Sequence, residues 1–276
     1  MKRACVIGWP VAHSRSPLIH GYWLRTYGID GSYVKRPVRP EEVPAFLGGM
    51  RAEGLAGCNV TIPHKEAVYA LAAERMPAAR AVGAANTLWF EGDRLFADNT
   101  DSIGFMNHLR ASVPAFDAGK RAVSVLGAGG AARGIIYAFL EAGAPEVRVF
   151  NRTRERADSV ARHFGVHVKV YDWRDRADRS RDVGVLVNAT SLGMDHGEPL
   201  DMDLGGLDDT CIVADLVYVP LVTPLLVAAR RRGLAIVDGL GMLLHQATPG
   251  FHKWFGVDPE VTDELRDLLV KDIEAK

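Results

Sequence analysis

Residues 57–65 read GCNVTIPHK and place a lysine directly after a short strand-like run. Pro63 is predicted to open a helix at its first position, which puts Lys65 in the first helical turn. A positive charge there is opposed by the helix dipole, so the amine would release a proton readily. Lys65 is therefore a candidate proton donor, although lysines are mostly solvated surface charges and the motif alone leaves both roles open.

Two polar stretches follow Lys65, and each ends a strand-like run. They read VGAANTL at 82–88 and ADNTDSIGF at 97–105, and both combine small residues with amide or carboxylate side chains. Binding sites for small molecules contain a few such polar groups in fixed positions. This neighbourhood favours a chemical role for Lys65.

A glycine-rich turn occurs later, in RAVSVLGAGGAARGIIYAFLEAG at 121–143. Gly127, Gly129 and Ala132 have the GxGxxA spacing between a predicted strand and a predicted helix. A tight strand-to-helix turn is the simpler explanation of the glycines. Their position also lets a dinucleotide pyrophosphate approach the backbone and the positive helix N-terminus, and we expect nucleotide binding here.

The stretch after the next strand, EVRVFNRTRER at 146–156, predicts which dinucleotide binds. An NAD site usually has an acidic residue about 20 positions beyond the first glycines, which binds the ribose 2′-hydroxyl. Here the region instead carries Asn151, Arg152, Thr153, Arg154 and Arg156. Guanidinium groups match a 2′-phosphate in charge and geometry, so the sequence favours NADP.

The elements that must position these residues alternate between strand-like and helix-like segments. Short runs rich in Val and Ile, such as 3–8, 55–62, 121–127 and 211–217, are separated by helical candidates at 16–28, 64–76 and 129–143. This order predicts an α/β protein with largely parallel sheets. We expect two domains, one formed by residues 1–104 and 242–276 and the other by residues 105–241, with the C-terminal helices returning to the first domain.

Composition limits the functions further. The 276 residues carry 33 Lys and Arg against 34 Asp and Glu, so a formal net charge of -1 argues against nucleic acid or an anionic membrane as partner. The N-terminal apolar run is interrupted too early for a signal peptide, and no segment is long enough to span a bilayer. We expect a cytoplasmic protein. Its three cysteines are far apart and read as free buried thiols, and we predict no metal site.

Taken together, the motifs resemble the shikimate dehydrogenase family. They occur in that family's order over nearly the whole chain and read HSRSPLIH at 13–20, NVTIPHK at 59–65, GAANT at 83–87, DNTD at 98–101, GAGGAA at 127–132, NRTRER at 151–156, NATS at 188–191, DLVYVPLVTPLL at 215–226 and DGLGMLLHQA at 238–247. None of them is specific alone, but the combination is.

The resemblance implies an enzyme that reduces 3-dehydroshikimate to shikimate with NADPH, a step towards aromatic amino acids. It implies an N-terminal α/β substrate domain and a Rossmann-type NADP-binding domain, and homologues of this kind are monomers or homodimers. Lys65 and Asp101 would be catalytic. The implied substrate contacts are Ser14, Ser16, Thr61, Lys65, Asn86, Asp101, Tyr218 and Gln246. The implied cofactor contacts are Gly127, Ala128, Gly129, Gly130, Ala131, Asn151, Arg152, Thr153, Arg154, Arg156, Leu216, Gly239 and Met242.

The sequence departs from the family pattern at two places and leaves two alternatives. Gly21 stands where an asparagine is common, and Leu216 replaces a frequent methionine. A quinate/shikimate dehydrogenase is the nearer alternative, although NRTRER lacks the acid that NAD would favour, and the serine pair at 14 and 16 favours shikimate. A non-catalytic NADP-binding regulator is the other, and it would be expected to have lost Lys65 and Asp101. The helix expected between Lys65 and Gly83 also carries a proline at 77, and we expect a tolerated local change there that alters the approach to the cofactor cleft.

Overall fold

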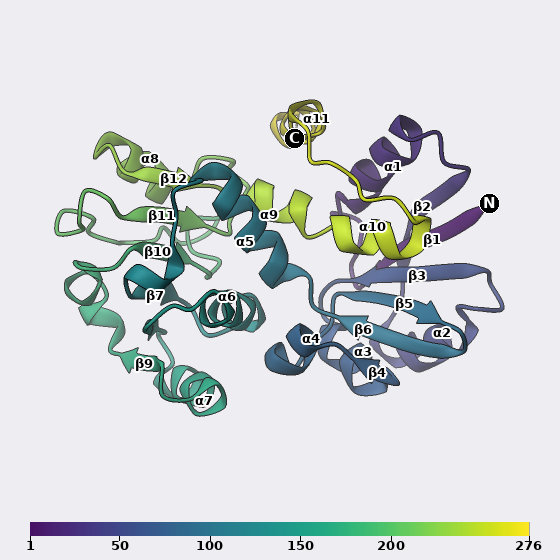
Figure 1. The fold of residues 1–276 in the computed structure, drawn as a ribbon, viewed down its shortest axis with the longest axis horizontal. Helices are drawn as coiled ribbons and strands as arrows, with labels where there is room; N and C mark the ends of the chain where they lie inside the picture. Colours follow the sequence, from purple (N-terminus) through teal and green to yellow (C-terminus); the bar gives the residue numbers. More distant parts are fainter. Residues whose placement is uncertain (276) are drawn as a thin grey trace. The chain divides into compact units, whose positions relative to one another are not determined.

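A computed structural model describes residues 1–275. These residues fold into two compact units. The first unit contains Met1–Thr100 and Leu244–Ala275, and the second contains Asp101–Leu243. The sequence had placed these divisions a few residues away, at 104/105 and 241/242. Figure 1 labels the elements of both units.

The first unit is built on a mixed six-stranded sheet in the order β2-β1-β3-β5-β6-β4. Its strands are β1 (Lys2–Gly8), β2 (Gly31–Pro37), β3 (Leu55–Val60), β4 (Glu74–Arg75), β5 (Thr87–Glu91) and β6 (Arg94–Asp98). β1 pairs in parallel with β2 and β3, whereas β5 is antiparallel to both of its neighbours, β3 and β6. Consequently the carboxyl ends of β1, β3 and β6 and the start of β5 lie along one edge of the sheet.

Helices cover both faces of this sheet (Figure 1). They are α1 (Ser16–Thr26), α2 (Val43–Gly49), α3 (Lys65–Leu71), α4 (Pro77–Val82), α10 (Thr248–Phe255) and α11 (Asp263–Glu274), with a 3-10 turn at Pro40–Glu42. α11 begins where the Thr262 hydroxyl accepts from the Leu265 amide, and it buries Leu265, Leu269 and Ile273 on one face. It packs against α1, so the C-terminal helix returns to the first unit as the sequence predicted.

Two details of the region around Lys65 were predicted wrongly. Pro63 does not open the helix, because the chain first makes a turn in which the His64 amide donates to the Thr61 carbonyl at 3.1 Å, and α3 begins at Lys65 itself. The helix also does not continue to Gly83. It ends at Leu71, the chain forms the edge strand β4, and Pro77 starts the separate helix α4 at a position where no amide donor is needed.

The second unit contains an all-parallel six-stranded sheet in the order β12-β11-β10-β7-β8-β9. The strands are β7 (Val123–Leu126), β8 (Val147–Phe150), β9 (Val168–Tyr171), β10 (Val185–Asn188), β11 (Ile212–Asp215) and β12 (Ala235–Val237). The strand order reverses between β7 and β10, which is the Rossmann arrangement that leaves a ligand-binding crevice at the carboxyl ends of these strands. The sequence missed β9 and the short strand β4.

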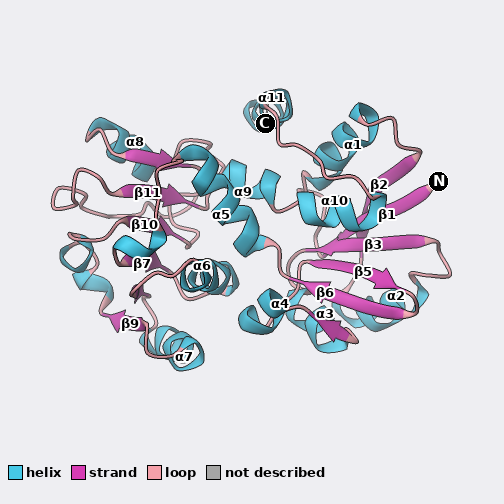
Figure 2. Cartoon of the chain, in the orientation of Figure 1, coloured by secondary structure: helices cyan, strands magenta, loops and turns pink. Residues whose placement is uncertain are grey.

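The helices of the second unit are distributed over the two faces of its sheet. They are α5 (Asp101–Ser112), α6 (Gly130–Glu141), α7 (Arg154–Phe164) and α8 (Pro224–Arg231), with 3-10 turns at Ala118–Lys120, Trp173–Asp175 and Asp178–Ser180. One buried cluster joins α5, α6 and α7 to the sheet, and a second cluster joins α8 to the other face. Because both faces are covered, the strands are almost continuously apolar. Figure 2 shows these helices and strands by colour.

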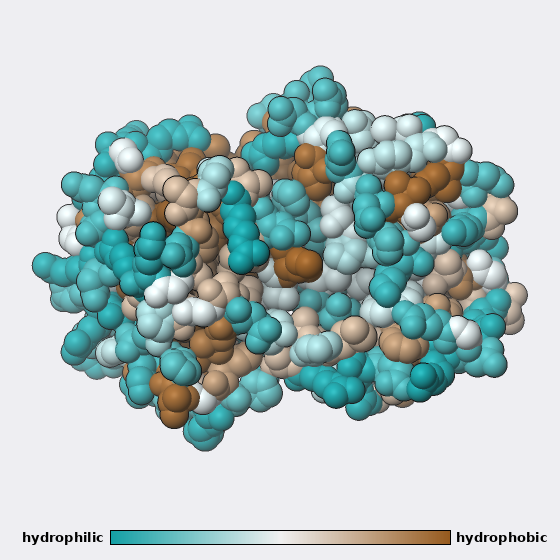
Figure 3. Space-filling model, viewed as in Figure 1, coloured by the Kyte–Doolittle hydropathy of each residue, from teal (hydrophilic) through white to brown (hydrophobic). Residues whose placement is uncertain are grey.

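The segment α9 (Gly239–His245) crosses the division between the units. Figure 3 shows hydrophilic residues over most of the visible face, with apolar residues singly or in small groups. This matches cores that lie inside each unit. Within residues 1–275, no helix has both the length and the apolar character needed to cross a bilayer.

Candidate functional site

The predicted substrate residues of the first unit follow the strand ends that share one edge of its sheet. Ser14 follows β1, Thr61 follows β3, and Asn86 directly precedes β5. Backbone hydrogen bonds hold these loops together, since the Val60 amide donates to the Asn86 carbonyl at 2.8 Å and the Thr61 amide donates to the Ile7 carbonyl at 2.9 Å. Residues far apart in the sequence therefore meet at this edge.

Ser14 and Ser16 form a hydroxyl pair at the start of α1. Their Oγ atoms are 3.2 Å apart, and the Ser16 amide donates to the Ser14 Oγ at 3.3 Å. Both side chains are half-buried. The pair offers neutral hydroxyl donors, which can bind a carboxylate without adding another positive charge.

Lys65 is the first residue of α3 and is half-buried. The preceding His64 fixes the start of the helix, because its side chain is buried and its Nε2 lies 2.7 Å from the Val38 carbonyl oxygen. The Lys65 carbonyl in turn accepts from the Ala85 amide at 2.9 Å. This bond joins the NVTIPHK segment to GAANT, so Lys65 and Asn86 are held in the same part of the first unit.

Asn86 and Gln246 are in direct contact, although 160 residues separate them. The Asn86 Nδ2 donates to the Gln246 Oε1 at 3.0 Å. Asn86 is 3% exposed, and its Oδ1 accepts from the Thr100 amide at 2.8 Å and from the Thr87 hydroxyl at 3.0 Å. The sequence did not assign roles to Thr87 and Thr100, even though NTL and NTD carry both threonines next to asparagines.

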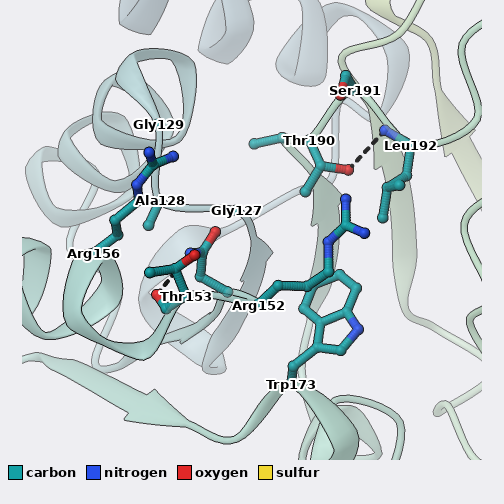
Figure 4. A pocket seen from close by; sticks show the side chains of 12 residues that line it. Gly127, Ala128, Gly129, Arg152, Thr153, Arg156, Trp173, Thr190, Ser191 and Leu192 are labelled. Carbon is teal, nitrogen blue, oxygen red and sulfur yellow. Dashed lines mark hydrogen bonds between the residues drawn. The ribbon is translucent and has the colours of Figure 1, made fainter. Parts of the chain in front are cut away.

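Seven of the thirteen predicted cofactor residues line a cavity of about 500 Å³ at the carboxyl edge of the sheet (Figure 4). It is lined by Gly127, Ala128, Gly129, Asn151, Arg152, Thr153, Arg156, Trp173, Ala189, Thr190, Ser191 and Leu192. Gly127 has a φ of +116°, and a Cβ atom there would lie 2.9 Å from the Ala189 carbonyl oxygen. Only glycine fits this turn. Gly130 and Ala131 form the first turn of α6, whose N-terminus follows the loop.

The arginines after β8 are arranged in different ways. Arg152 and Arg156 line the cavity, and Figure 4 shows both side chains beside it. The Arg152 guanidinium donates to the Glu198 carboxylate at 2.9 Å, in a pair whose side chains are 61% and 71% exposed. Arg154 instead donates to Asp158, one turn further along α7, at 3.0 Å. The geometry thus favours Arg152 and Arg156 over Arg154 as ligands of an anion in the cavity.

The opposite wall of the cavity is the NATS loop after β10, to which the sequence assigned no role. The Asn188 Oδ1 accepts from the Thr190 hydroxyl at 2.6 Å, and the Asn188 Nδ2 donates to the buried Asp215 carboxylate at 2.9 Å. Asp215 also accepts from the Thr223 hydroxyl at 2.6 Å. Burial raises the pKa of Asp215 to about 6, against the lowering effect of these hydrogen bonds. The loop is therefore fixed by a buried polar cluster.

Trp173 is a further lining residue that the sequence did not predict. It lies in the turn after β9, and the Arg176 guanidinium carbon is 4.7 Å from the centroid of its ring. No motif signals this residue, because it follows the strand that the hydrophobic pattern failed to reveal. Its indole ring gives the otherwise polar cavity a flat aromatic surface.

The remaining predicted residues also belong to the second unit. Leu216 and Tyr218 follow β11, and Gly239 packs so closely on the Leu216 carbonyl that a side chain there would overlap it. Met242 packs against the core that contains α5 and α6. Asp101 is buried and begins α5. Lys65 and Asp101 therefore belong to different units, and within residues 1–275 no group of three or more His, Cys, Asp or Glu residues is placed to hold a metal ion.

Two family models match this chain. Residues 6–88 match the shikimate dehydrogenase substrate binding domain, and residues 111–194 match the shikimate / quinate 5-dehydrogenase model. The first match includes the segments that carry Ser14, Thr61, Lys65 and Asn86. The second begins in α5 and includes the glycine loop and the NATS loop.

Individual proteins resemble the chain over nearly its full length. The shikimate dehydrogenase (NADP(+)) of Azorhizobium caulinodans is 53% identical over 276 residues, which is 100% of this chain and 98% of that protein. The crystal structure of shikimate 5-dehydrogenase from Thermus thermophilus with NADP(H) and shikimate has a TM-score of 0.85 and 35% identity, covering 100% and 99% of the two chains. Quinate dehydrogenase from Corynebacterium glutamicum with NAD has a TM-score of 0.89 at 28% identity, covering 98% and 99%.

Proposed function

The chain belongs to the shikimate dehydrogenase family, and we propose that it catalyses the reversible NADPH-dependent reduction of 3-dehydroshikimate to shikimate, a step towards aromatic amino acids. The observation that carries the proposal is the full-length 53% identity to a shikimate dehydrogenase (NADP(+)). The chain also carries the residue types that this reaction needs. Ser14 and Ser16 offer hydroxyls for the substrate carboxylate, and Lys65 offers an amine as proton donor.

The residues around the cavity of the second unit fit NADP. The bare backbone at Gly127 permits close approach of a pyrophosphate, and the N-terminus of α6 offers backbone donors to it. Arg152 and Arg156 supply positive charge where a 2′-phosphate requires it. Trp173 would provide a stacking surface for the adenine ring. The bound cofactor supplies the hydride that reduces the substrate carbonyl.

The substrate is held by the polar residues of the first unit. We assign the substrate carboxylate to the hydroxyls of Ser14 and Ser16 and the ring oxygens to Thr61, Asn86 and Gln246. Tyr218 is assigned to the same pocket from the second unit. Leu216, Gly239 and Met242 are assigned to the nicotinamide side, where small or apolar groups exclude water.

Lys65 and Asp101 are assigned the proton chemistry. As the carbonyl is reduced, negative charge develops on its oxygen, and the Lys65 ammonium can both stabilise this charge and donate the proton. The Asp101 carboxylate would keep Lys65 positively charged and correctly oriented.

Quinate dehydrogenase is the alternative that the fold does not exclude, since one such enzyme has a TM-score of 0.89 to this chain. The arginines after β8 favour NADP, and no acidic residue occupies the segment 151–154. We propose a cytoplasmic location, which suits the three free cysteines. The state of assembly is proposed to be a monomer or a homodimer.

The proposal is tested by mixing the purified protein with NADPH and 3-dehydroshikimate and following the loss of NADPH absorbance. We expect loss of NADPH to match the formation of shikimate in equal amounts, identified by mass spectrometry. A parallel reaction without 3-dehydroshikimate controls for non-specific oxidation. Binding of NADP without any turnover would instead support a non-catalytic regulator.

A further inference from the structure

A series of buried polar side chains leads to the proposed substrate ligands Asn86 and Gln246 in the first unit. Tyr33, on β2, lies at the far end of the series. The Tyr33 hydroxyl donates to the Asn59 Oδ1 at 2.7 Å, and the Asn59 Nδ2 donates to the Thr87 Oγ1 at 3.2 Å. The Thr87 hydroxyl then donates to the Asn86 Oδ1 at 3.0 Å. We call Tyr33, Asn59 and Thr87 the relay.

One end of the relay meets proposed substrate ligands. Thr87 donates to Asn86, and Asn86 is in turn bonded to Gln246. The relay thus connects a buried tyrosine with the proposed ligands of the ring oxygens.

Two contacts with the backbone show how the asparagine amides are oriented. The Thr100 amide lies 2.8 Å from the Asn86 Oδ1, and an N–H group can only donate. The Asn59 Nδ2 lies 3.2 Å from the Asn86 carbonyl oxygen, which can only accept. Neither side-chain amide can therefore be turned over without placing two donors or two acceptors against each other.

These fixed orientations decide with which atom each amide can meet a substrate. The Asn86 oxygen already accepts from Thr87 and Thr100, so Asn86 can meet a substrate oxygen only through its nitrogen. The Gln246 oxygen accepts from Asn86, which leaves the Gln246 nitrogen for the same purpose. Both amides would thus recognise substrate oxygens as hydrogen-bond acceptors.

The Tyr33 ring is held firmly enough to serve as the fixed end of such a series. It stacks on the His20 ring at a centroid distance of 4.0 Å and packs against Trp254 at 5.9 Å. Burial raises the pKa of the Tyr33 phenol well above its ordinary value. Burial also lowers the pKa of His20 to about 3. Tyr33 therefore remains a hydrogen-bond donor, next to an uncharged imidazole, at neutral pH.

We propose that Tyr33 is a positioning residue for the substrate pocket, acting through Asn59 and Thr87 to fix the amides of Asn86 and Gln246 as hydrogen-bond donors. The inference rests on the proposed function, because it assumes that Asn86 and Gln246 bind the substrate. It extends that function by assigning a role to three buried residues that would not touch the substrate themselves.

The test compares Tyr33→Phe with Tyr22→Phe as a matched control. Tyr22 is in the same unit, and its hydroxyl lies 3.2 Å from the Thr262 hydroxyl, away from the relay. Tyr33→Phe removes one buried hydrogen bond, so we expect the KM for shikimate to rise about tenfold while kcat changes less than about threefold. The Kd of shikimate measured calorimetrically without cofactor should rise by the same factor, and Tyr22→Phe should leave all three constants unchanged.

A second pair of variants separates positioning from general loss of structure. If Tyr33 acts through Asn86, the tenfold effect of Tyr33→Phe should disappear in an Asn86→Ala background. Thr87→Val interrupts the relay at another point with little change in volume and should reproduce the rise in KM.

Three results would count against this account. An active wild type with an unchanged KM in Tyr33→Phe would overturn the relay alone. Persistence of the full effect in the Asn86→Ala background would show that Tyr33 acts by another route and would also overturn it. A wild type that neither binds nor oxidises shikimate would overturn the proposed function itself.

Discussion

The candidate sites of the two units consist of different kinds of chemical group. The cavity of the second unit is formed by glycine backbone and by long charged side chains, and the Arg152 side chain is 61% exposed. The polar cluster of the first unit consists of short amides and hydroxyls that bond one another, and Asn86 is 3% exposed. One site is open and highly charged, whereas the other is buried and hydrogen-bonded.

This difference predicts how substitutions behave in each site. Exposed charges interact with a ligand largely independently, and salt screens them. Buried hydrogen-bonded groups polarise and orient one another, so removing one disturbs the rest. We therefore expect separable effects in the second unit and strongly coupled effects in the first.

The largest expected effect concerns Lys65 and Asp101, to which we assign the proton chemistry. Lys65→Ala should lower kcat by roughly 10²- to 10⁴-fold and change the KM for shikimate much less, because the amine acts mainly in the transition state. The double variant with Asp101→Ala should be little worse than the worse single variant, since either loss disables the pair. Steady-state kinetics provide the measurement.

Lys65→Met serves as the control for volume, since it keeps a long side chain but not the charge. Thermal melting checks that each variant is folded. A near-normal kcat in Lys65→Ala would show that Lys65 is only a binding or surface charge and has no catalytic role. Additive losses in the double variant would mean that the residues act separately.

A smaller effect is expected from Asp215, whose pKa burial raises to about 6 from an ordinary 3.8. The folded state then holds the proton more tightly than the unfolded state, so stability is greatest below about pH 4 and falls as the pH rises to about 6. Relative to Asp215→Asn, the wild type should lose on the order of 2 to 3 kcal/mol of unfolding free energy across this window.

Urea denaturation of both proteins at several pH values between about 4 and 7 measures this difference, because other titrating groups cancel. A constant difference across the window would show that Asp215 has an ordinary pKa. A wild type that gains unfolding free energy relative to Asp215→Asn as the pH rises would have the wrong sign for a buried acid. Either result would make the NATS loop less dependent on buried charge than the structure indicates.

The next effect tests whether Arg152 acts on the 2′-phosphate. Arg152→Ala removes one charge-assisted contact and should weaken NADP binding by about 1.5 to 3 kcal/mol while leaving NAD nearly unchanged. Arg162→Ala removes an exposed positive charge elsewhere on α7 and controls for net charge. Calorimetric Kd values for both cofactors give the answer, and equal weakening of NADP and NAD binding would show that Arg152 does not bind the 2′-phosphate.

The smallest effect is expected from Glu198, the carboxylate that pairs with Arg152 at 2.9 Å. A 2′-phosphate must replace this carboxylate, so Glu198→Gln should tighten NADP binding about two- to fivefold, the scale of an exposed ion pair. The affinity for NAD should not change. The advantage of the variant should shrink as salt is added, and weaker NADP binding would show that Glu198 supports the site instead of competing for it.

The two sites also differ in how far the sequence revealed them. The cofactor loop could be predicted because Gly127 to Ala132 form one continuous motif whose backbone requirements are local. The sequence predicted most strands for the same reason, since a run such as VLV at 185–187 is apolar throughout. It missed the edge strand β9, which reads VKVY, and with it Trp173.

The substrate side was less predictable, because its order depends on contacts between distant residues. Tyr33 and Asn59 are 26 residues apart, and Asn86 and Gln246 are 160 apart. The motifs identified Asn86 and Gln246, but nothing local shows that Tyr33 points at Asn59. The start of α3 was misplaced for a related reason, since His64 is held by the distant carbonyl of Val38.

The central claim is that this chain is an NADP-dependent enzyme for shikimate, and one assay tests it most directly. The wild-type protein is supplied with shikimate or quinate, each with NADP or NAD, and kcat/KM is determined for all four pairs. The account predicts that shikimate with NADP gives the highest value and that replacing either partner lowers it. A highest value for quinate with NAD would contradict the account and make the chain a quinate dehydrogenase.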